Sequence, residues 1–365
     1  MSELRQILDL ARLAQSRGEE VCLVTVVGVE GSSYRKPGAR MLLTRGGQRA
    51  GTISGGCLEG EVSKKAWWLT AEGASIQRYT SFFDEDSGIA YGLGCGGTIL
   101  LLLERGQPAL ATLEALRRTL EQEEPAVALI SIAEQNPGTR CIASASGQVL
   151  FGNPALAPLA AQTLRNGTHT TLLPASEAGA TLLFCERITP PPALWVFGAG
   201  DDAQPLVEFA HKLGWRITVA DGRSHLARPE RFPLARQVLT LTPGTPLPLE
   251  PADAAVLMTH SYEQDHALLA RLLPLPLAYL GVLGPRRRTR HIVDQIIAQP
   301  GSQPGTLLGI TADEAMARLH APVGLGLPGH TPAAIALSIA AEIHSIFAAP
   351  AAPECAAPLA PAHAL

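Results

Sequence analysis

The residues of this sequence best suited to chemistry are two cysteines that lie in glycine-rich segments. Cys57 lies within residues 51–60 and Cys95 within residues 92–98. Cys57 directly precedes a predicted helix, and the start of a helix lowers the pKa of a thiol, which favours the reactive, metal-binding thiolate. We therefore predict a reactive or ligating role for both thiols. The alternative is that both are small residues that fill tight turns.

Three glycine-rich segments surround this chemistry: the first glycine loop (residues 31–40), the second (51–60) and the third (92–98). Glycine at this density destabilises a fold unless the backbone needs positive φ angles or must approach another group closely. Free amides combined with hydroxyl and cationic side chains form natural anion sites. We expect the first glycine loop to bind a phosphate or carboxylate through Ser32, Ser33, Arg35 and Lys36.

A second motif lies in the other half of the chain, where Gly198-Ala199-Gly200-Asp201-Asp202-Ala203 follows an apolar stretch. This GxGxxA pattern predicts a strand, a tight turn and a helix whose free amides can face an anion. Asp221 ends the next predicted strand, where an acid can bind a ribose hydroxyl. The pattern predicts a Rossmann-like fold. Whether its pocket binds a dinucleotide stays open, because Asp201 and Asp202 would repel a phosphate placed there.

The elements expected in the first part mix helices with strands. Helices are expected over 3–16 and from 58 past 67, and strands over 21–27, 41–44, 49–53 and 98–103. In a middle segment we expect a helix over 112–120 and strands over 127–132 and 181–186. Three successive prolines at 190–192 suit a domain junction. We predict a first domain over 1–189, including the mixed middle segment 107–189. No internal repeat is evident.

The second part alternates strands and helices, which predicts a parallel sheet covered on both faces. Strands are expected over 193–197, 216–220, 254–259 and 277–282, and helices over 204–213, 263–273, 286–297 and 331–347. The predicted fold class is therefore α/β: a mixed N-terminal domain, then a Rossmann-like domain over 193–347. The Ala- and Pro-rich residues 348–365 are expected to form a disordered tail.

Composition excludes several classes of protein. The chain has 365 residues, 46% of them apolar and 17% charged, with a net charge of -4. Nucleic acid is not an expected partner because there is no long basic run. No apolar stretch is long enough for a membrane span, and no secretory signal is recognisable. Six cysteines are too few for a disulfide scaffold. We therefore expect a cytoplasmic protein. The sequence contains no CxxC pair, so a structural zinc site is not expected. Cys22, Cys141 and Cys185 lie in apolar runs and are expected in the core.

Taken together, these motifs resemble the XdhC/CoxI family of xanthine dehydrogenase accessory proteins. The resemblance rests on GSSYRKPGARML, GTISGGCLEGEV and GLGCGGTI in the first part, and on LWVFGAGDDAQPL, GWRITVADGR, YLGVLGPRRR and HAPVGLGLPGHTPAAIALSIAAEI in the second. It implies a maturation factor rather than an enzyme: a chaperone that binds and protects molybdenum cofactor, supports its sulfuration with a cysteine desulfurase, and inserts it into a molybdenum hydroxylase apoenzyme. It also implies a homodimer.

The chemistry of the loops and the resemblance together predict cofactor binding, in dinucleotide form or without a nucleotide, at two sets of residues, of which the resemblance itself carries over Cys57, Cys95, Glu59, Gly198, Gly200 and Asp221. The first set is Ser32, Ser33, Arg35, Gly55, Gly56, Cys57, Glu59, Gly94, Cys95 and Gly96, and the second is Gly198, Gly200 and Asp221. Molybdenum would be held only through the cofactor, near Cys57 and Cys95. The chain departs from the family pattern at Asp201, at Gly222 and at Gly326.

Two other functions remain open. One is an NAD(P)-dependent oxidoreductase that uses the Asp221 pocket, with His260 as acid and base. The other is a scaffold that binds a desulfurase and a hydroxylase without using its own thiols.

Overall fold

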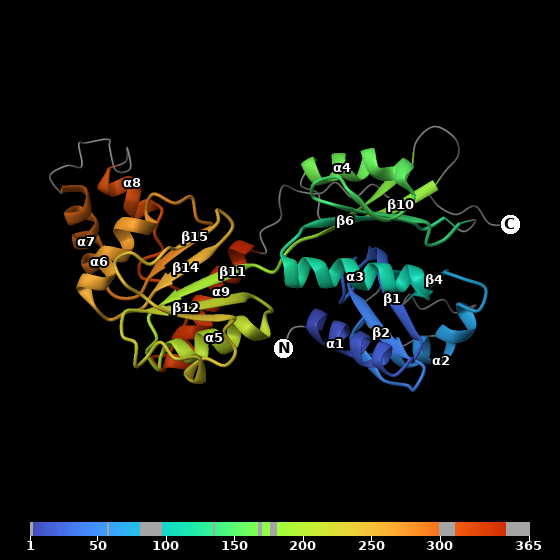
Figure 1. Cartoon of the computed structure of the whole chain (residues 1–365), viewed down its shortest axis with the longest axis horizontal. Helices are drawn as coiled ribbons and strands as arrows, with labels where there is room; N and C mark the ends of the chain where they lie inside the picture. The colour runs from blue at the N-terminus through green and yellow to red at the C-terminus, as the bar shows by residue number, and fades with distance from the viewer. Residues whose placement is uncertain are drawn as a thin grey trace. The chain divides into compact units, whose positions relative to one another are not determined.

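The computed structural model describes residues 3–56, 58–80, 97–133, 136–166, 170–175, 181–298 and 311–347. The chain forms two compact units, Glu3–Pro190 and Pro191–Pro350. Figure 1 colours the first unit from blue to green and the second from yellow-green to red. Each unit has its own sheets and cores, and each is described separately below.

The first unit begins with a helix and a five-stranded antiparallel sheet. Its elements are α1 (Glu3–Ser16), β1 (Val21–Gly31), β2 (Arg40–Thr44), β3 (Arg49–Gly51), α2 (Glu59–Leu69), β4 (Ser75–Thr80) and β5 (Gly97–Arg105). The strand order is β3-β2-β1-β5-β4. Gly18, at φ 64°, follows the end of α1 and turns the chain into β1.

A second helix and a second antiparallel sheet complete this unit. The elements are α3 (Gln107–Gln122), β6 (Ala126–Ser131), β7 (Arg140–Ser144), β8 (Val149–Gly152), η1 (Pro154–Leu156), α4 (Ala157–Asn166), β9 (Thr170–Ala175) and β10 (Thr181–Ile188). The strand order is β8-β7-β6-β10-β9.

The two halves of the first unit share one topology, so the unit is an internal duplication. In both, a helix precedes a three-stranded meander, a second helix follows, and two further strands return to the far side of the first strand. We call residues 3–105 the first repeat and residues 107–188 the second repeat. The sequence-based expectation of no internal repeat is therefore wrong.

Equivalent hydrogen bonds show how close the correspondence is. Gly38 N donates to Val26 O, and Gly138 N donates to Ser131 O, each at 2.8 Å. In each repeat the arginine two residues later binds the carbonyl of that glycine, at 2.8 Å in the first repeat and 3.0 Å in the second. The sequence trace of this match is short: Pro-Gly-Ala-Arg at 37–40 and Pro-Gly-Thr-Arg at 137–140.

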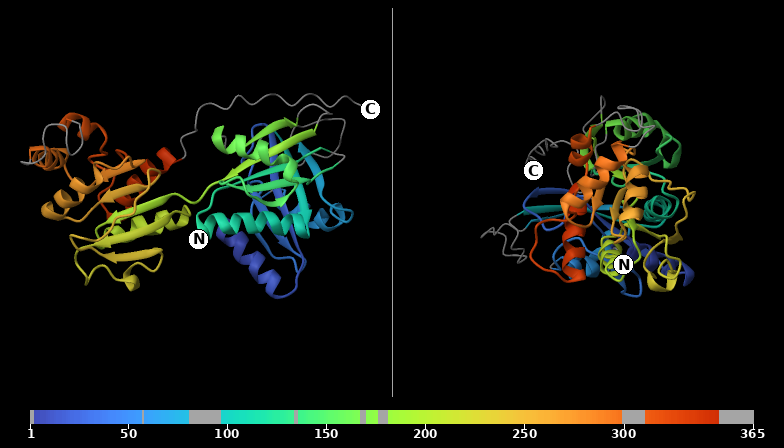
Figure 2. Two further views of the ribbon diagram at one scale, coloured as in Figure 1. Left: turned by 45° about the horizontal axis from the view of Figure 1, so that its top comes forward. Right: turned by 90° about the vertical axis from the view of Figure 1, so that its left-hand side faces the viewer.

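The two repeats share one apolar core. The inner faces of both sheets pack with α1 and α3, and α3 runs between the sheets (Figures 1 and 2). Helix α2 covers the outer face of the first sheet and α4 that of the second. Cys22, Cys141 and Cys185 are buried on these outer faces, which confirms their predicted place in the core. Burial raises the pKa of Cys22 to about 12 and that of Cys185 to about 11, so these thiols are inert.

Two buried ion pairs connect the repeats reciprocally. Arg40 of the first repeat pairs with Glu186 of the second, with Arg40 Nη1 2.9 Å from Glu186 Oε1. Arg140 of the second repeat pairs with Glu104 of the first. The two arginines occupy equivalent positions, and so do the two glutamates, on β5 and β10. Burial and the nearby charge of Arg40 lower the pKa of Arg140 to about 10, so its guanidinium is protonated at neutral pH.

The second unit is a five-stranded parallel sheet. Its strands are β11 (Ala193–Phe197), β12 (Arg216–Asp221), β13 (Gln237–Thr240), β14 (Ala254–Leu257) and β15 (Tyr279–Val282). The order β13-β12-β11-β14-β15 changes direction between β11 and β14, which is the switch point where open α/β sheets bind ligands.

Helices cover both faces of this sheet (Figure 1). They are α5 (Ala203–Lys212), α6 (Tyr262–Leu272), α7 (Arg286–Ala298), α8 (Ala312–Ala317) and α9 (Pro332–Phe347), with a short η2 (Pro229–Arg231). α5 and α9 pack on one face, and α6, α7 and α8 on the other. The predicted α/β class with a Rossmann-like second part is confirmed. None of the described helices is long and apolar enough to cross a membrane.

The exchanged ion pairs lead to a stability prediction. Arg140→Met leaves Glu104 buried without its cation, so we expect the first unit to lose about 3–5 kcal/mol. The double variant Arg140→Met/Glu104→Leu should recover most of this loss, because no buried charge remains. Urea unfolding monitored by circular dichroism measures both. Arg12→Met is the control, since that side chain is 63% exposed. An effect no larger than that of the control would contradict the prediction.

Candidate functional site

Among the described residues, the first glycine loop of the first repeat contacts the second loop and also Gly97, near the end of the third. The first loop follows β1, the second follows β3, and the third leads into β5. Gly31 and Gly97 are paired in the register of β1 and β5. A side chain at Gly97 would collide with the carbonyl of Ser32, so glycine is required where the first and third loops meet.

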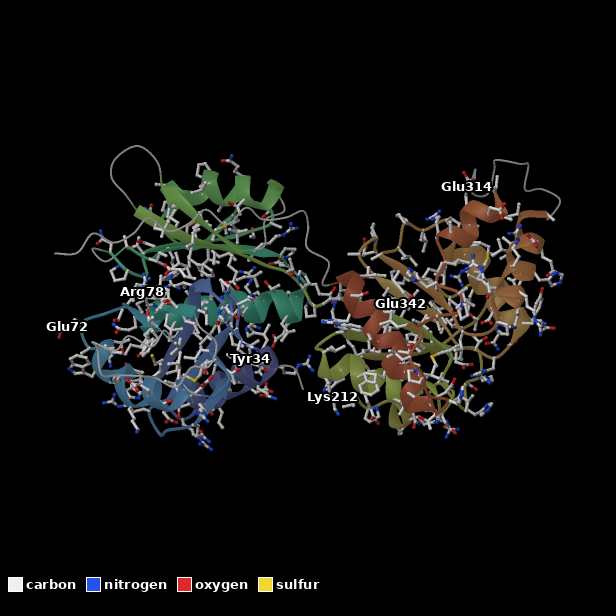
Figure 3. All side chains as sticks on the ribbon, turned by 180° about the vertical axis from the view of Figure 1, so that it is seen from behind. Tyr34, Glu72, Arg78, Lys212, Glu314 and Glu342 are labelled. Carbon is white, nitrogen blue, oxygen red and sulfur yellow. The ribbon has the colours of Figure 1, made fainter. Side chains whose placement is uncertain are left out.

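One carboxylate connects the first and second loops. Glu3, in the first turn of α1, forms an ion pair with Arg35. Its Oε1 accepts hydrogen bonds from the amide and hydroxyl of Thr52, at 2.8 and 2.9 Å. Tyr34 also lies beside the second loop, next to Gly55, and is 71% exposed (Figure 3). Glu3 therefore positions Arg35, the predicted anion ligand. The sequence analysis did not identify Glu3.

The second loop is organised around Ser54 and Glu59. Glu59 is buried, and its Oε1 accepts from the amides of Ile53 and Ser54 at 3.1 and 2.9 Å. Its Oε2 accepts from the Ser54 hydroxyl at 2.5 Å. The Ser54 hydroxyl oxygen in turn accepts from the amides of Gly56 and Leu58. Burial raises the pKa of Glu59, but these hydrogen bonds outweigh burial and lower it. Glu59 thus holds the loop's conformation from inside.

The other predicted residues of the first unit fall into three groups. Ser32, Gly55 and Gly56 are exposed at the surface. The hydroxyl of Ser33 is shielded from solvent and has no hydrogen-bond partner among the described residues. Cys57, Gly94, Cys95 and Gly96 lie outside the described residues, so their predicted roles are untested.

The second repeat lacks two of these loops. Residues 52–58 connect β3 to α2, whereas Asn153 alone connects β8 to η1. Residues 81–96 connect β4 to β5, whereas 176–180 connect β9 to β10. Because the frames of the two repeats match, the longer segments are additions carried by the first repeat. Added loops on a retained framework are where proteins commonly place binding residues.

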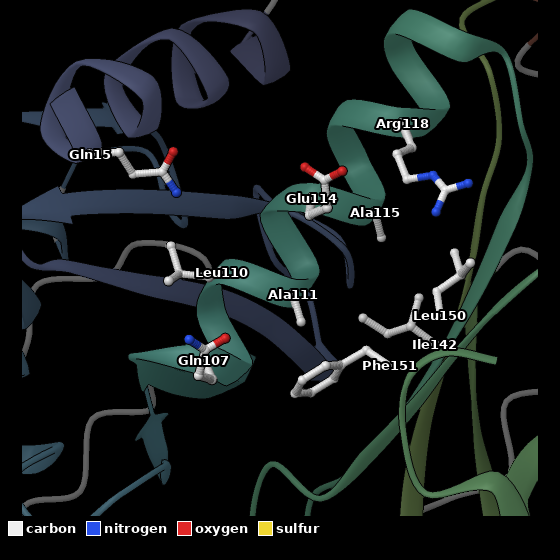
Figure 4. Close-up of a pocket in the computed structure, with 10 residues that line it drawn as sticks. All are labelled: Gln15, Gln107, Leu110, Ala111, Glu114, Ala115, Arg118, Ile142, Leu150 and Phe151. Atoms are coloured by element: carbon white, nitrogen blue, oxygen red, sulfur yellow. The ribbon is translucent and has the colours of Figure 1, made fainter.

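The second repeat has a different feature, a cavity of about 300 Å³ between α1, α3 and the β7–β8 hairpin (Figure 4). Leu150 and Phe151 of β8 face Ala111 and Ala115 of α3 across it. In the first repeat, Ala50 stands at the position of Phe151, and no residue corresponds to the bulged Leu150. Larger side chains and the bulge therefore hold α3 away from its hairpin. The cavity is lined by none of the predicted site residues.

The glycine motif of the second unit has the expected backbone geometry. Gly198 has φ 125°, and a side chain there would collide with the carbonyl of Met258. Ala203 is buried where α5 packs on the sheet. A side chain at Gly200, however, would meet the carboxylate of Asp202. The loop therefore places a negative charge beside the glycine that, in dinucleotide-binding folds, approaches a phosphate.

Asp221 is fully buried and engaged by its own unit. Its Oδ2 accepts from the amide of Ala199 at 2.7 Å, and its Oδ1 accepts from the amide of Arg223 at 2.8 Å. The guanidinium of Arg223 binds both carboxylate oxygens. Burial raises the pKa of Asp221, but these bonds lower it overall. A ribose could bind Asp221 only by displacing Arg223, so here the acid primarily orders the glycine loop.

Four acids of this sheet edge pair with basic side chains. Besides Asp221–Arg223, the pairs are Asp201–Arg231 at 2.6 Å, Asp202–His260 at 2.7 Å and Asp265–Arg288 at 2.7 Å. The Asp202–His260 pair joins the loops after β11 and β14 across the switch point. The paired acids would have to release their partners, or repel the phosphate, if a pyrophosphate bound beside them. No group of three or more His, Cys, Asp or Glu suited to a metal occurs among the described residues.

Sequence reasoning missed Glu3, Ser54, Arg223 and Arg231. Glu3 and Arg231 have no local signal, because each acts on a residue about 30 positions or more away. Ser54 also had no clear signal, because it lies five residues before Glu59, whereas the capping box needs a serine three residues before a glutamate.

The Glu59 network predicts a pH dependence. Its folded pKa lies below the ordinary value of 4.5, so its stabilisation is complete above that value and is lost as the pH falls through the folded pKa. We expect Glu59→Gln to lose about 1–3 kcal/mol at neutral pH and to show less acid sensitivity than the parent. Urea unfolding between neutral and acid pH measures both effects. Glu72→Gln, at an exposed carboxylate beyond α2, is the control, and identical pH profiles for the parent and Glu59→Gln would refute the prediction.

Comparison with known proteins agrees with this architecture. Residues 14–80 match the model of the XdhC and CoxI family, and residues 194–343 match that of the XdhC Rossmann domain. The chain is 33% identical over 330 residues to a Bacillus subtilis protein named as a probable xanthine dehydrogenase subunit, covering 89% of this chain and 92% of that protein. It is 34% identical over 121 residues to the Escherichia coli molybdenum cofactor insertion chaperone PaoD, covering 33% of this chain and 37% of PaoD.

A solved structure shows the same fold. The crystal structure described as a xanthine dehydrogenase from Bacillus halodurans superposes with a TM-score of 0.77 at 27% identity, covering 95% of this chain and 96% of that one. Similarity to this structure and to the Bacillus subtilis protein extends over both units. On this evidence the chain belongs to the XdhC and CoxI family.

Proposed function

We propose that this chain is a chaperone that binds molybdenum cofactor at the glycine loops of its first repeat and inserts it into a xanthine dehydrogenase-type hydroxylase. The observation that carries the proposal is the contact between the first and second glycine loops, which Glu3 and Glu59 hold in place. The name of the PaoD relative supports the insertion role.

The residues present fit such a cofactor. It offers an anionic phosphate end and a sulfur-bound metal end, which need cationic or amide donors and soft ligands respectively. Arg35 and the unpartnered hydroxyl of Ser33 suit the phosphate. Cys57 and Cys95 would supply the soft ligands near molybdenum. The bracing of the second loop by Glu59 would keep the position of Cys57 constant before the cofactor arrives.

This role requires partners. They are the hydroxylase apoenzyme, which receives the cofactor, and a cysteine desulfurase, which supplies sulfur for its sulfuration while the chain protects it. We assign the chain to the cytoplasm and to a homodimer. The NAD(P)-dependent oxidoreductase is the weaker candidate, because Asp202 lies over Gly200 and Arg223 occupies Asp221.

The thiols are tested by cofactor retention. When the chain is produced together with the cofactor pathway, we expect the purified protein to carry molybdenum and pterin. Cys57→Ser/Cys95→Ser should carry at least about tenfold less, since the soft ligands are lost. Metal analysis and pterin fluorescence measure both components. Cys141→Ala, at a buried thiol, is the matched control. A parent protein without either component, or full retention by the double variant, would count against the proposal.

The second unit is tested by nucleotide binding. Because paired acids line the sheet edge, we expect NADH and NADPH to bind more weakly than about 1 mM. Asp201→Asn/Asp202→Asn should bind them more tightly than the parent, since it removes repulsion at the start of α5. Fluorescence titration gives the dissociation constants. Tight binding by the parent, with hydride transfer, would favour the oxidoreductase.

A further inference from the structure

The cavity beside α3 is used by none of the functions above. Its volume of about 300 Å³ lies at the lower end of the range for small-molecule sites. Most of its lining residues are apolar, and the polar ones are Gln15, Gln107, Glu114 and Arg118. A mainly apolar cavity with a few polar groups is the usual form of a site for a small organic molecule.

The cavity belongs to the second repeat and is not a gap common to both repeats. A side chain at Gly51 would collide with the carbonyl of Arg40 and with Ile7, so α1 lies directly on β3. Gly152 is the equivalent glycine, because a side chain there would collide with the carbonyl of Arg140. The atoms nearest to that side chain all belong to β7 and none to α3. The hairpin therefore stands away from its helix only in the second repeat.

The two walls of the cavity suit a planar ring. Ala111 and Ala115 of α3 form one wall, and Leu150 and Phe151 form the opposite one (Figure 4). The small alanine side chains leave room for a flat guest, and the ring of Phe151 offers it an aromatic contact. Ile142, which is fully buried, also lines the cavity. An aromatic guest would thus bury its surface mainly against apolar side chains.

The charges beside the cavity are already paired. Both carboxylate oxygens of Glu114 accept hydrogen bonds from Arg117, at 2.7 and 2.8 Å. Nη2 of Arg118 donates to Glu124 at 2.8 Å. A charged guest would lose its hydration and would have to compete with these pairs for a counter-ion. The cavity therefore favours an uncharged molecule.

One hydrogen-bond donor beside the cavity has no acceptor. Nε of Arg118 is shielded from solvent and lacks a hydrogen-bond partner within the part of the chain that the structure describes. A buried donor without a partner costs free energy, which an acceptor atom of a guest would offset. An apolar side chain of a partner protein would leave this donor unpaired. A small molecule with an acceptor oxygen or nitrogen is therefore the better occupant.

We infer that this cavity binds a small, uncharged aromatic molecule whose single hydrogen-bond acceptor, such as a carbonyl oxygen, faces Arg118. The site lies between α1, α3 and the β7–β8 hairpin and shares no residue with the glycine loops, so the inference does not depend on the cofactor role. Because α3 packs in the core that both repeats share, an occupied cavity stabilises the first unit against unfolding.

Acetophenone, a benzene ring that carries one carbonyl group, is the probe. In a methyl-labelled sample of the full chain, we expect it to shift the methyl resonances of Leu110, Ile142 and Leu150. The shifts should saturate with a dissociation constant of about 1–5 mM, as is usual for a ligand of this size. Benzoate, a charged molecule of similar size, should bind at least about fivefold more weakly, because its carboxylate would lose hydration without gaining an unpaired cation.

Two variants locate the site. Ala111→Leu fills part of the cavity and should weaken acetophenone binding by at least about tenfold. Arg118→Lys keeps the positive charge but removes the Nε donor, and should weaken binding by about fivefold. The matched controls are Ala155→Leu, at an exposed alanine outside the cavity, and Arg12→Lys, at an exposed arginine of α1. Both controls should bind like the parent.

Circular dichroism establishes that each variant is folded. The inference is wrong if acetophenone gives no saturable shift at the three labelled methyl groups of the parent, or if Ala111→Leu binds it as tightly as the parent does. Equal affinities for benzoate and acetophenone, or an unchanged affinity in Arg118→Lys, would overturn the chemistry assigned to the ligand. A loss of binding in either control would overturn the assignment to this cavity.

Discussion

The first unit depends on the reciprocal exchange of buried charge between its two repeats. Arg40 and Glu186 are separated by 146 positions in the sequence, yet each needs the other in the low-dielectric core. The equivalent pair, Arg140 with Glu104, runs in the opposite direction. Buried pairs of this kind add little net stability compared with apolar side chains, but a single unpaired member is costly. Their main effect is therefore to select the one packing of the repeats in which both pairs form.

That packing leaves the strand ends and loops of each repeat free to vary. Each sheet has its inner face in the shared core and its outer face under its own helix, so only the strand ends and loops can change without disturbing the core. The first repeat carries the long glycine loops there. The second repeat keeps short connections and instead gains bulk at Leu150 and Phe151, which opens the cavity beside α3. Duplication followed by divergence accounts for both differences.

The second unit has a nucleotide-type fold whose polar residues bind one another. The glycine turn and the acid at the end of β12 are present, but Asp221 binds the loop and Arg223 rather than projecting toward a ligand. The switch point is crossed by Asp202 and His260. Through these contacts, polar side chains at this edge of the sheet form hydrogen bonds and ion pairs with one another.

The sequence by itself determined the local elements and the family. Periodicity located both main helices of the first repeat, and the GxGxxA motif located the turn after β11, because both signals depend on neighbouring residues. Only the tertiary structure decided what the polar residues do. Glu59 and Asp221 hold their own loops in place by accepting hydrogen bonds from backbone amides. The sequence could not predict this role, because it does not specify the direction in which those amides point. The duplication was likewise hidden, because the two repeats share sheet order and hydrogen bonds while their sequences retain only a few matching positions.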